Sequence, residues 1–282
     1  MRGCTAWREP TNSSAMELID THCHLESYLK QGELDAVLAR ARTAEVTQVV
    51  TVGTGPDDWD VYCGLAAKYP GIVRYSAGLH PCHVAADWEK ALAGVESYWA
   101  AGSRPRPVAL GECGLDRFHL PKDPVEAETV IGWQKRAFEV QLRVAKQLGC
   151  PLIIHSRGAF RETVDLIDAS GVDWTKVVFH CFVEGPAEVA ELVKRGAWAS
   201  FTGILTYKTA QNVRESAAAQ GLARLMVETD APWLTPMPHR GKPNEPGFVR
   251  HTAEFAAKEV FRVPLAELAA VTTANARRFF GM

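Results

Sequence analysis

The sequence predicts a single α/β domain folded as a (β/α)8 TIM barrel, and three observations support this prediction. The chain has 282 residues, and barrels of about 250 residues routinely form one domain. Eight short apolar runs alternate with helical patterns, as in a parallel sheet with crossover helices. The first run is not followed by the GxGxxG sequence of an open dinucleotide-binding sheet. We therefore expect the eight units to close into a barrel.

Each predicted strand is short and apolar, which is typical of strands buried on both faces. The runs are 18–24, 48–53, 74–81, 108–116, 152–157, 177–182, 197–203 and 225–232. The segments between them carry apolar residues at helical spacing, most clearly Phe138, Leu142, Ala145 and Leu148, and Val189, Leu192 and Val193. Gly149 and Gly196 stand where these two helices should end. Prolines near expected helix starts are Pro56, Pro124 and Pro186.

The two ends of the chain differ in character. Residues 1–16 are polar and precede the first apolar run, so we predict a disordered extension outside a barrel domain of residues 17–282. Pro232 begins a loop rich in proline and glycine, and helical patterns follow at 247–261 and 264–279. These last helices are expected to close the barrel.

Composition and charge exclude some classes of protein. The net charge is −2 and 47% of the residues are hydrophobic, so the surface lacks the basic excess of a broad, non-specific duplex binder. The seven cysteines are scattered without a CxxC pair. The sequence carries no apolar run long enough for a signal peptide or a membrane span. We predict a cytoplasmic protein with free thiols, no membrane association and no obligate protein partner.

Ionisable residues end most of the predicted strands, although apolar strands are a costly place for such side chains unless they are paired or bind a metal. These residues are His22, His24, Glu112, His155, His180 and Asp230. Taken singly, each has an ordinary explanation as a core histidine, a turn residue or a cap. In a barrel, however, the carboxyl ends of all strands surround one mouth, where active sites lie. We therefore predict that the six side chains form a metal site.

The donor set indicates two ions. Four imidazoles and two carboxylates suit Zn, Mn, Fe or Co better than Mg. Six donors exceed one tetrahedral ion and suit two ions bridged by a carboxylate, for which Glu112 is the candidate. Because side chains alternate along a strand, Cys23, Cys113 and Cys181 should point outward into the layer between strands and helices instead of binding metal.

At this point the chain resembles a known family. The runs LIDTHCHLE, SAGLHPCHV, ALGECGLD, LIIHSR, VFHCF, SFTGILTYK, VETDAPWLTP, PHRGKPNEP and TTANARRFF are similar, in order, to the TatD-type metal-dependent deoxyribonucleases of the amidohydrolase superfamily. The resemblance implies a (β/α)8 barrel with two divalent metals. It implies 3′-to-5′ exonuclease action on DNA, supported by Mg, although relatives often carry Zn. Some members are assigned to removing D-amino acids from tRNA.

The resemblance also implies ligand sets. By position, His22, His24, Glu112 and Asp230 match the ligands of one metal, and Glu112, His155 and His180 match those of the other. Departures from the family pattern lie in loops over the mouth and concern the substrate. They are Cys82 followed by His83 after the GLHP run, Gly158, the segment Val183–Gly185, and Arg117 with Phe118.

We hypothesise that Asp230 accepts a proton from the attacking water as general base, with Glu112 as the second catalytic carboxylate. The cations expected to bind substrate are His80, Arg157, Lys208 and Arg240. Glu228 shares a strand face with Asp230 and is expected to orient a ligand, and Asn244 is expected to shape the loop after Pro232. Aromatic residues able to stack on bases, or to pack in the loops, are Trp233, Phe118 and Tyr207.

Three functions follow from this interpretation. The first is a deoxyribonuclease acting on single-stranded or 3′ ends of DNA. The second uses the same metals on another bond, either the ester of D-aminoacyl-tRNA or a small amide or ester, because one fold hosts many reactions. The third is a non-catalytic barrel that only binds, which the complete set of predicted ligands disfavours.

Overall fold

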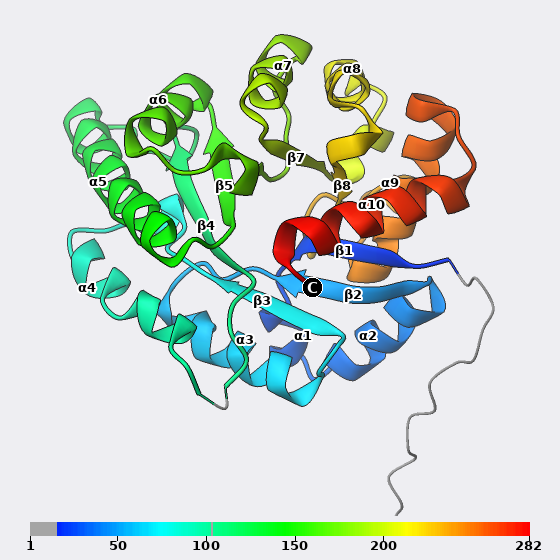
Figure 1. The fold of residues 1–282 in the computed structure, drawn as a ribbon, viewed down its shortest axis with the longest axis horizontal. Helices are drawn as coiled ribbons and strands as arrows, with labels where there is room; N and C mark the ends of the chain where they lie inside the picture. The colour runs from blue at the N-terminus through cyan, green and yellow to red at the C-terminus, as the bar shows by residue number, and fades with distance from the viewer. Residues whose placement is uncertain (1–15, 103) are drawn as a thin grey trace, which may run out of the picture.

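The computed structural model describes residues 16–102 and 104–282, and over these residues it forms the predicted barrel (Figure 1). The predicted extension of residues 1–16 thus lies, apart from Met16, outside the described part. Eight parallel strands follow one another in chain order around the sheet. They are β1 (Leu18–Cys23), β2 (Val46–Thr51), β3 (Val73–Ala77), β4 (Ala109–Asp116), β5 (Leu152–Arg157), β6 (Val177–Phe179), β7 (Trp198–Phe201) and β8 (Leu225–Val227).

The ring closes between its first and last strands. The backbone N–H of Asp230 donates to the carbonyl of His22 at 2.8 Å, and that of His24 donates to Ala231 at 2.8 Å. These bonds use the residues just past β8, so they close the sheet at the mouth. They also hold three candidate ligands in one backbone network.

Helices surround the strands on the outside of the barrel (Figure 1). They are α1 (Glu26–Lys30), α2 (Leu34–Thr43), α3 (Pro56–Lys68), α4 (Trp88–Leu92), α5 (Pro124–Leu148), α6 (Phe160–Ser170), α7 (Pro186–Arg195), α8 (Gln211–Gln220), α9 (Val249–Phe255) and α10 (Leu265–Phe280). A π-helical segment, Ala256–Phe261, continues α9. The three predicted prolines open α3, α5 and α7, and Gly149 and Gly196 end α5 and α7 in left-handed conformation.

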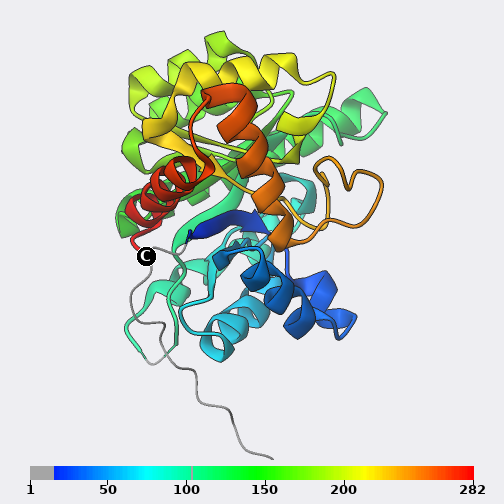
Figure 2. The same cartoon turned by 90° about the vertical axis from the view of Figure 1, so that its right-hand side faces the viewer.

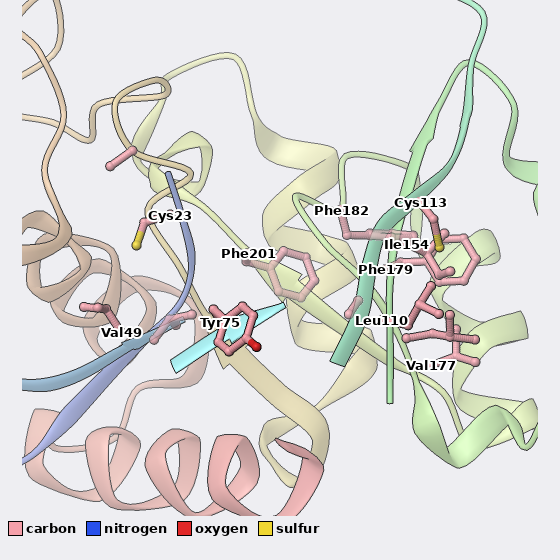
Figure 3. Close-up of a cluster of buried hydrophobic side chains, with 14 of the residues drawn as sticks. Cys23, Val49, Tyr75, Leu110, Cys113, Ile154, Val177, Phe179, Phe182 and Phe201 are labelled. Carbon is pink, nitrogen blue, oxygen red and sulfur yellow. The ribbon is translucent and has the colours of Figure 1, made fainter. Parts of the chain in front are cut away.

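Alternation along the strands builds two separate cores. One side of each strand faces the helices, where Leu152 and Ile154 join a large apolar layer that includes Tyr75 and Phe201 (Figure 3). The opposite side fills the barrel interior with a smaller cluster. From the strands this cluster takes Ile19, Val50, Ala109, Ile153, Val178, Trp198 and Met226. Strands buried on both faces explain why the predicted runs are apolar throughout.

The two ends of the barrel have different covers. Ala276, Phe279 and Phe280 of α10 join the interior cluster and so close one end. The loop between β8 and α9 projects from the opposite end (Figure 2). Asn244, buried in this loop, donates to the carbonyls of Thr229 and Trp233, which confirms that it shapes the loop. The apolar end therefore supplies stability, and the loop end carries the polar residues.

Some local predictions were wrong. His180 and Asp230, the last two predicted ligands, do not lie on strands, since β6 ends at Phe179 and β8 at Val227. Asp230 has a φ of 55°, a left-handed conformation that extended strands cannot contain. Cys181, with a φ of 44°, is likewise outside the strand and is absent from the apolar layer that Cys23 and Cys113 join. Leu148, the last residue of α5, is 36% exposed and is absent from the apolar layer that Phe138, Leu142 and Ala145 join.

Candidate metal centre

Glu112 lies at the middle of the mouth, and the residues around it explain how β4 presents it. Gly111 and Gly114 have φ values of 136° and 138°, which side-chain-bearing residues rarely adopt. A Cβ on Gly114 would lie 2.0 Å from the carbonyl oxygen of His155 on β5. The GECG sequence thus lets β4 press against its neighbour while the Glu112 side chain, only 2% exposed, points into the mouth.

One oxygen of Glu112 faces the first group of donors. Glu112 Oε2 lies 3.3 Å from His22 Nε2. His22 Nε2 is 3.3 Å from His24 Nε2 and 3.7 Å from Asp230 Oδ1, and His24 Nε2 is 3.5 Å from that same oxygen. These four side chains come from β1, β4 and the residues after β8. The donor atoms of His22, His24 and Asp230 lie within reach of one cation, and Glu112 contacts this group through His22.

The other oxygen of Glu112 faces a second group. Glu112 Oε1 lies 2.7 Å from His180 Nε2, 2.8 Å from His155 Nδ1 and 3.2 Å from His80 Nε2. His80 was expected on the substrate-binding rim, but its Nε2 is also 3.2 Å from His155 Nδ1. It therefore lies within the second donor group, because the turn after β3 folds the GLHP segment into the mouth.

The donor atoms fit divalent cations. A tetrahedral ion with Zn–N and Zn–O bonds of about 2.0–2.2 Å has donor–donor edges of about 3.3–3.5 Å, and most separations above are close to that. Both groups combine imidazole nitrogen with carboxylate oxygen, which suits Zn, Mn, Fe and Co. Glu112 turns one oxygen toward His22 and the other toward His155 and His180, so the clustered side chains fit metal binding.

The electrostatics of these side chains favour positive charge beside Glu112. Burial opposes ionisation of Glu112, yet His180, His80 and His22 hold its pKa well below the usual range. Burial also disfavours a charged His180, but Glu112 and Glu228 raise the pKa of His180 well above that of a free imidazole. Buried carboxylates that stabilise a neighbouring positive charge are the environment in which a metal ion replaces protons.

Two buried carboxylates contact the ring nitrogens of His155 and His180 that face away from Glu112. Asp116 Oδ2 lies 2.9 Å from His155 Nε2, and this contact turns the opposite ring nitrogen, Nδ1, toward Glu112. Glu228 accepts the N–H of Cys181 at 2.7 Å and lies 3.5 Å from His180 Nδ1. Glu228 was predicted for this position, but Asp116 was missed. Its signal was present in the sequence, because Glu112, Gly114 and Asp116 alternate along one face of β4.

The rim around the mouth pairs arginines with aromatic rings. The guanidinium of Arg157 lies 4.1 Å from the centre of the Phe118 ring, and that of Arg240 lies 4.2 Å from the Tyr207 ring. Phe118 is 68% exposed, whereas Tyr207 is half-buried and donates to Thr235. Each of these two arginines therefore already lies over an aromatic ring, and a nucleic-acid base could stack in the same way.

Two other predicted rim residues differ in their proximity to the centre. Trp233 is 57% exposed and its ring meets that of His24 edge-on at 5.2 Å. Lys208 is exposed in the loop after β7, and no contact places its ammonium at the donor groups. Lys208 as a substrate-binding residue thus stays a prediction.

Among the described residues, no helix is both long and apolar enough to cross a bilayer.

Comparison with known proteins agrees with this geometry. Residues 19–281 match the family described as TatD related DNase. The chain is 34% identical to the uncharacterized metal-dependent hydrolase YcfH of Escherichia coli strain K12, covering 94% of this chain and 96% of YcfH. It is 32% identical to the 3′-5′ ssDNA/RNA exonuclease TatD of Erwinia tasmaniensis, covering 94% and 100%.

A solved structure shows the same fold. The crystal structure of the TatD homologue YjjV from Escherichia coli K12 superposes with a TM-score of 0.84 at 26% identity, covering 94% of this chain and 98% of YjjV. Sequence, fold and clustered donors therefore agree, and they identify this protein as a member of the TatD family of metal-dependent hydrolases, enzymes that act on ester bonds.

Proposed function

We propose that the protein is a 3′-to-5′ exonuclease that hydrolyses phosphodiester bonds at single-stranded ends of DNA with two divalent cations. The observation that supports this proposal is that the two carboxylate oxygens of Glu112 point to different histidines. Oε2 lies 3.3 Å from His22 and Oε1 lies 2.7 Å from His180. A pair of cations bridged by one carboxylate is the arrangement of many phosphodiesterases. The relative from Erwinia tasmaniensis is named as an exonuclease of this polarity.

The proposed ligand sets follow the two groups. Glu112, His22, His24 and Asp230 would hold one cation, and Glu112, His155 and His180 the other. His80 lies as close to Glu112 Oε1 as His22 does to Oε2. We therefore propose that His80 is a further ligand of the second cation or binds a water molecule on that cation. Mg is proposed to support activity, and the imidazole-rich donors also suit Zn, Mn, Fe or Co.

The side chains of the chain divide the chemical work. When bound, the cations would supply Lewis acidity to the scissile phosphate and make a nearby water more acidic. Asp230 is the proposed general base, because its Oδ1 lies at the edge of the first group and its side chain is partly open to the mouth. Burial disfavours its charge, but the hydrogen bond from His24 and the charge of His22 lower its pKa, so it is ionised and free to accept a proton.

The rim is suited to a strand end more than to a duplex. Arg157 and Arg240 would contact phosphates, and their aromatic neighbours and Trp233 would stack on bases, a combination that binds single strands with few charges. A net charge of −2 is compatible with such a short contact. His80 belongs with the metal donors in this proposal, while Lys208 is kept as an outer phosphate contact.

The test uses substrates labelled at one end. The purified protein, supplied in turn with Mg, Mn and Zn, is incubated with single-stranded DNA labelled at the 3′ or the 5′ end. We expect immediate release of labelled mononucleotide from the 3′ label only. Asp230→Asn should abolish this release, whereas Asp168→Asn, which alters a surface pair with Arg195, should not.

The other hydrolase functions are outcomes of the same test. D-aminoacyl-tRNA and small esters are assayed beside DNA, because Cys82 and Gly158 change loops at the mouth. Ester cleavage without nucleotide release would overturn the nuclease proposal but retain the metal centre. Inertness toward all substrates with metal bound would favour a binding function.

A further inference from the structure

A third group of donors lies on the rim, outside the two groups that meet at Glu112. Cys82 Sγ is 3.6 Å from Asp116 Oδ2 and 3.7 Å from His119 Nδ1, and His119 Nδ1 is 2.9 Å from Asp116 Oδ2. These three atoms belong to the turn after β3 and to the end of β4 with its following loop. They also form a candidate cation group of their own, separate from those containing Glu112.

We propose that Cys82, Asp116 and His119 form an accessory site for a thiophilic divalent cation of the Zn²⁺ type. This inference concerns a site separate from the proposed catalytic pair and does not depend on the substrate. Nothing in the two-metal mechanism uses Cys82 or His119.

The spacing of the three atoms supports the proposal. With bonds of about 2.3 Å to sulfur and about 2.0–2.1 Å to nitrogen or oxygen, a tetrahedral zinc ion has sulfur–nitrogen and sulfur–oxygen edges of about 3.5–3.6 Å. The observed separations of 3.7 and 3.6 Å are almost equal to these. Only the nitrogen–oxygen edge, 2.9 Å in the structure, must widen, to about 3.3 Å.

The surroundings give this site an anchor and an opening. Asp116 is fully buried, and its other oxygen accepts the backbone N–H groups of Phe118 and His119 at 2.8 Å each. The carboxylate is therefore fixed, and its loop is folded around it. Cys82 and His119 are exposed, so a cation can enter from solvent and keep water or a phosphate oxygen as its fourth ligand.

The sulfur donor sets the selectivity. Mg prefers oxygen ligands, whereas thiolate selects Zn and other softer ions. The accessory site would then fill with Zn²⁺, Co²⁺ or Cd²⁺ but not with Mg²⁺. Because Asp116 Oδ2 is also the oxygen that contacts His155 Nε2, this cation would share a carboxylate with the second donor group.

Cobalt is the probe for the test, since thiolate bound to Co²⁺ gives a charge-transfer band in the near ultraviolet. Full-length protein is titrated with Co²⁺, the band is followed, and bound cobalt is counted after removal of free ion. We expect the band in the wild-type protein. Cys82→Ser should lack it and hold one cobalt fewer per chain, whatever number the central donors retain.

Two variants make the assignment specific. Cys63→Ser removes a buried cysteine that contacts Pro105, away from the mouth, and should keep both the band and the cobalt count. His119→Ala removes an exposed donor and should weaken the titration of the band at least about tenfold. A wild-type protein without the band, a band that survives Cys82→Ser, or an unchanged titration in His119→Ala would each overturn the proposal.

Discussion

Asp116→Asn tests how far the proposed catalytic centre depends on the hydrogen bond that Asp116 makes to the far nitrogen of His155. The substitution keeps the shape of the side chain but removes its charge. In the structure Asp116 is fully buried and its Oδ2 accepts from His155 Nε2 at 2.9 Å, a charge-assisted bond that fixes the imidazole with Nδ1 toward Glu112. Burial opposes ionisation of Asp116, but the bonds from His155 and His119 lower its pKa, so the charge is present at neutral pH.

The expected cost follows from that contact. Loss of a partner that orients a metal-binding histidine lowers metal affinity about 10–100-fold, which is about 1.4–2.7 kcal/mol. The assay is a Mn²⁺ titration against a competing chelator, carried out in a Cys82→Ser background so that the accessory site does not contribute. Asp168→Asn on the surface is the control and should bind normally. If the affinity of Asp116→Asn for Mn²⁺ changed less than about threefold, the proposal that Asp116 orients His155 for metal binding would be refuted.

Three further predictions concern the pH response, the core and the rim. Arg117 and Lys135 lower the pKa of Glu162 to about 2, so its ion pairs stabilise the fold above its ordinary pKa and lose their effect as pH falls toward 2. Glu162→Gln should therefore cost about 1 kcal/mol at pH 7 and nothing near pH 2, by urea unfolding at each pH; an equal cost at both would contradict this. Phe279→Ala, in the interior core, should lower the unfolding free energy by about 3–5 kcal/mol, and a loss below about 1 kcal/mol would show that α10 does not seal the barrel. Arg157→Ala should raise KM for single-stranded DNA with little change in kcat, while a fall in kcat alone would remove it from binding.

The sequence was sufficient for the fold because alternation and capping signals agreed. Runs apolar on both faces predicted parallel strands, and Pro124 and Gly149 bounded the longest helix. The six donors were predicted to gather because each was placed at the carboxyl end of a predicted strand. In the structure His22 lies 3.3 Å and His180 lies 2.7 Å from Glu112, while His24 and Asp230 reach the cluster through His22.

The features of the site that the sequence did not predict depend mainly on the conformation of loops and on contacts between strands. His80 could not be placed among the donors, because its position depends on how the GLHP turn folds back over β4. Asp116 was missed although it alternates with Glu112 along β4, because the chain alone does not show that its carboxylate contacts His155 on the neighbouring strand. The left-handed backbone at Cys181 and Asp230 likewise escaped a prediction based on extended strands.

Diffraction from crystals grown with Mn²⁺, at a wavelength where manganese scatters anomalously, tests the central claim most directly. We predict two anomalous peaks about 3.5–4 Å apart, one beside His22, His24 and Asp230 and the other beside His155 and His180, with one oxygen of Glu112 bound to each. A single peak, or two peaks with Glu112 bound to neither or to only one, would contradict it.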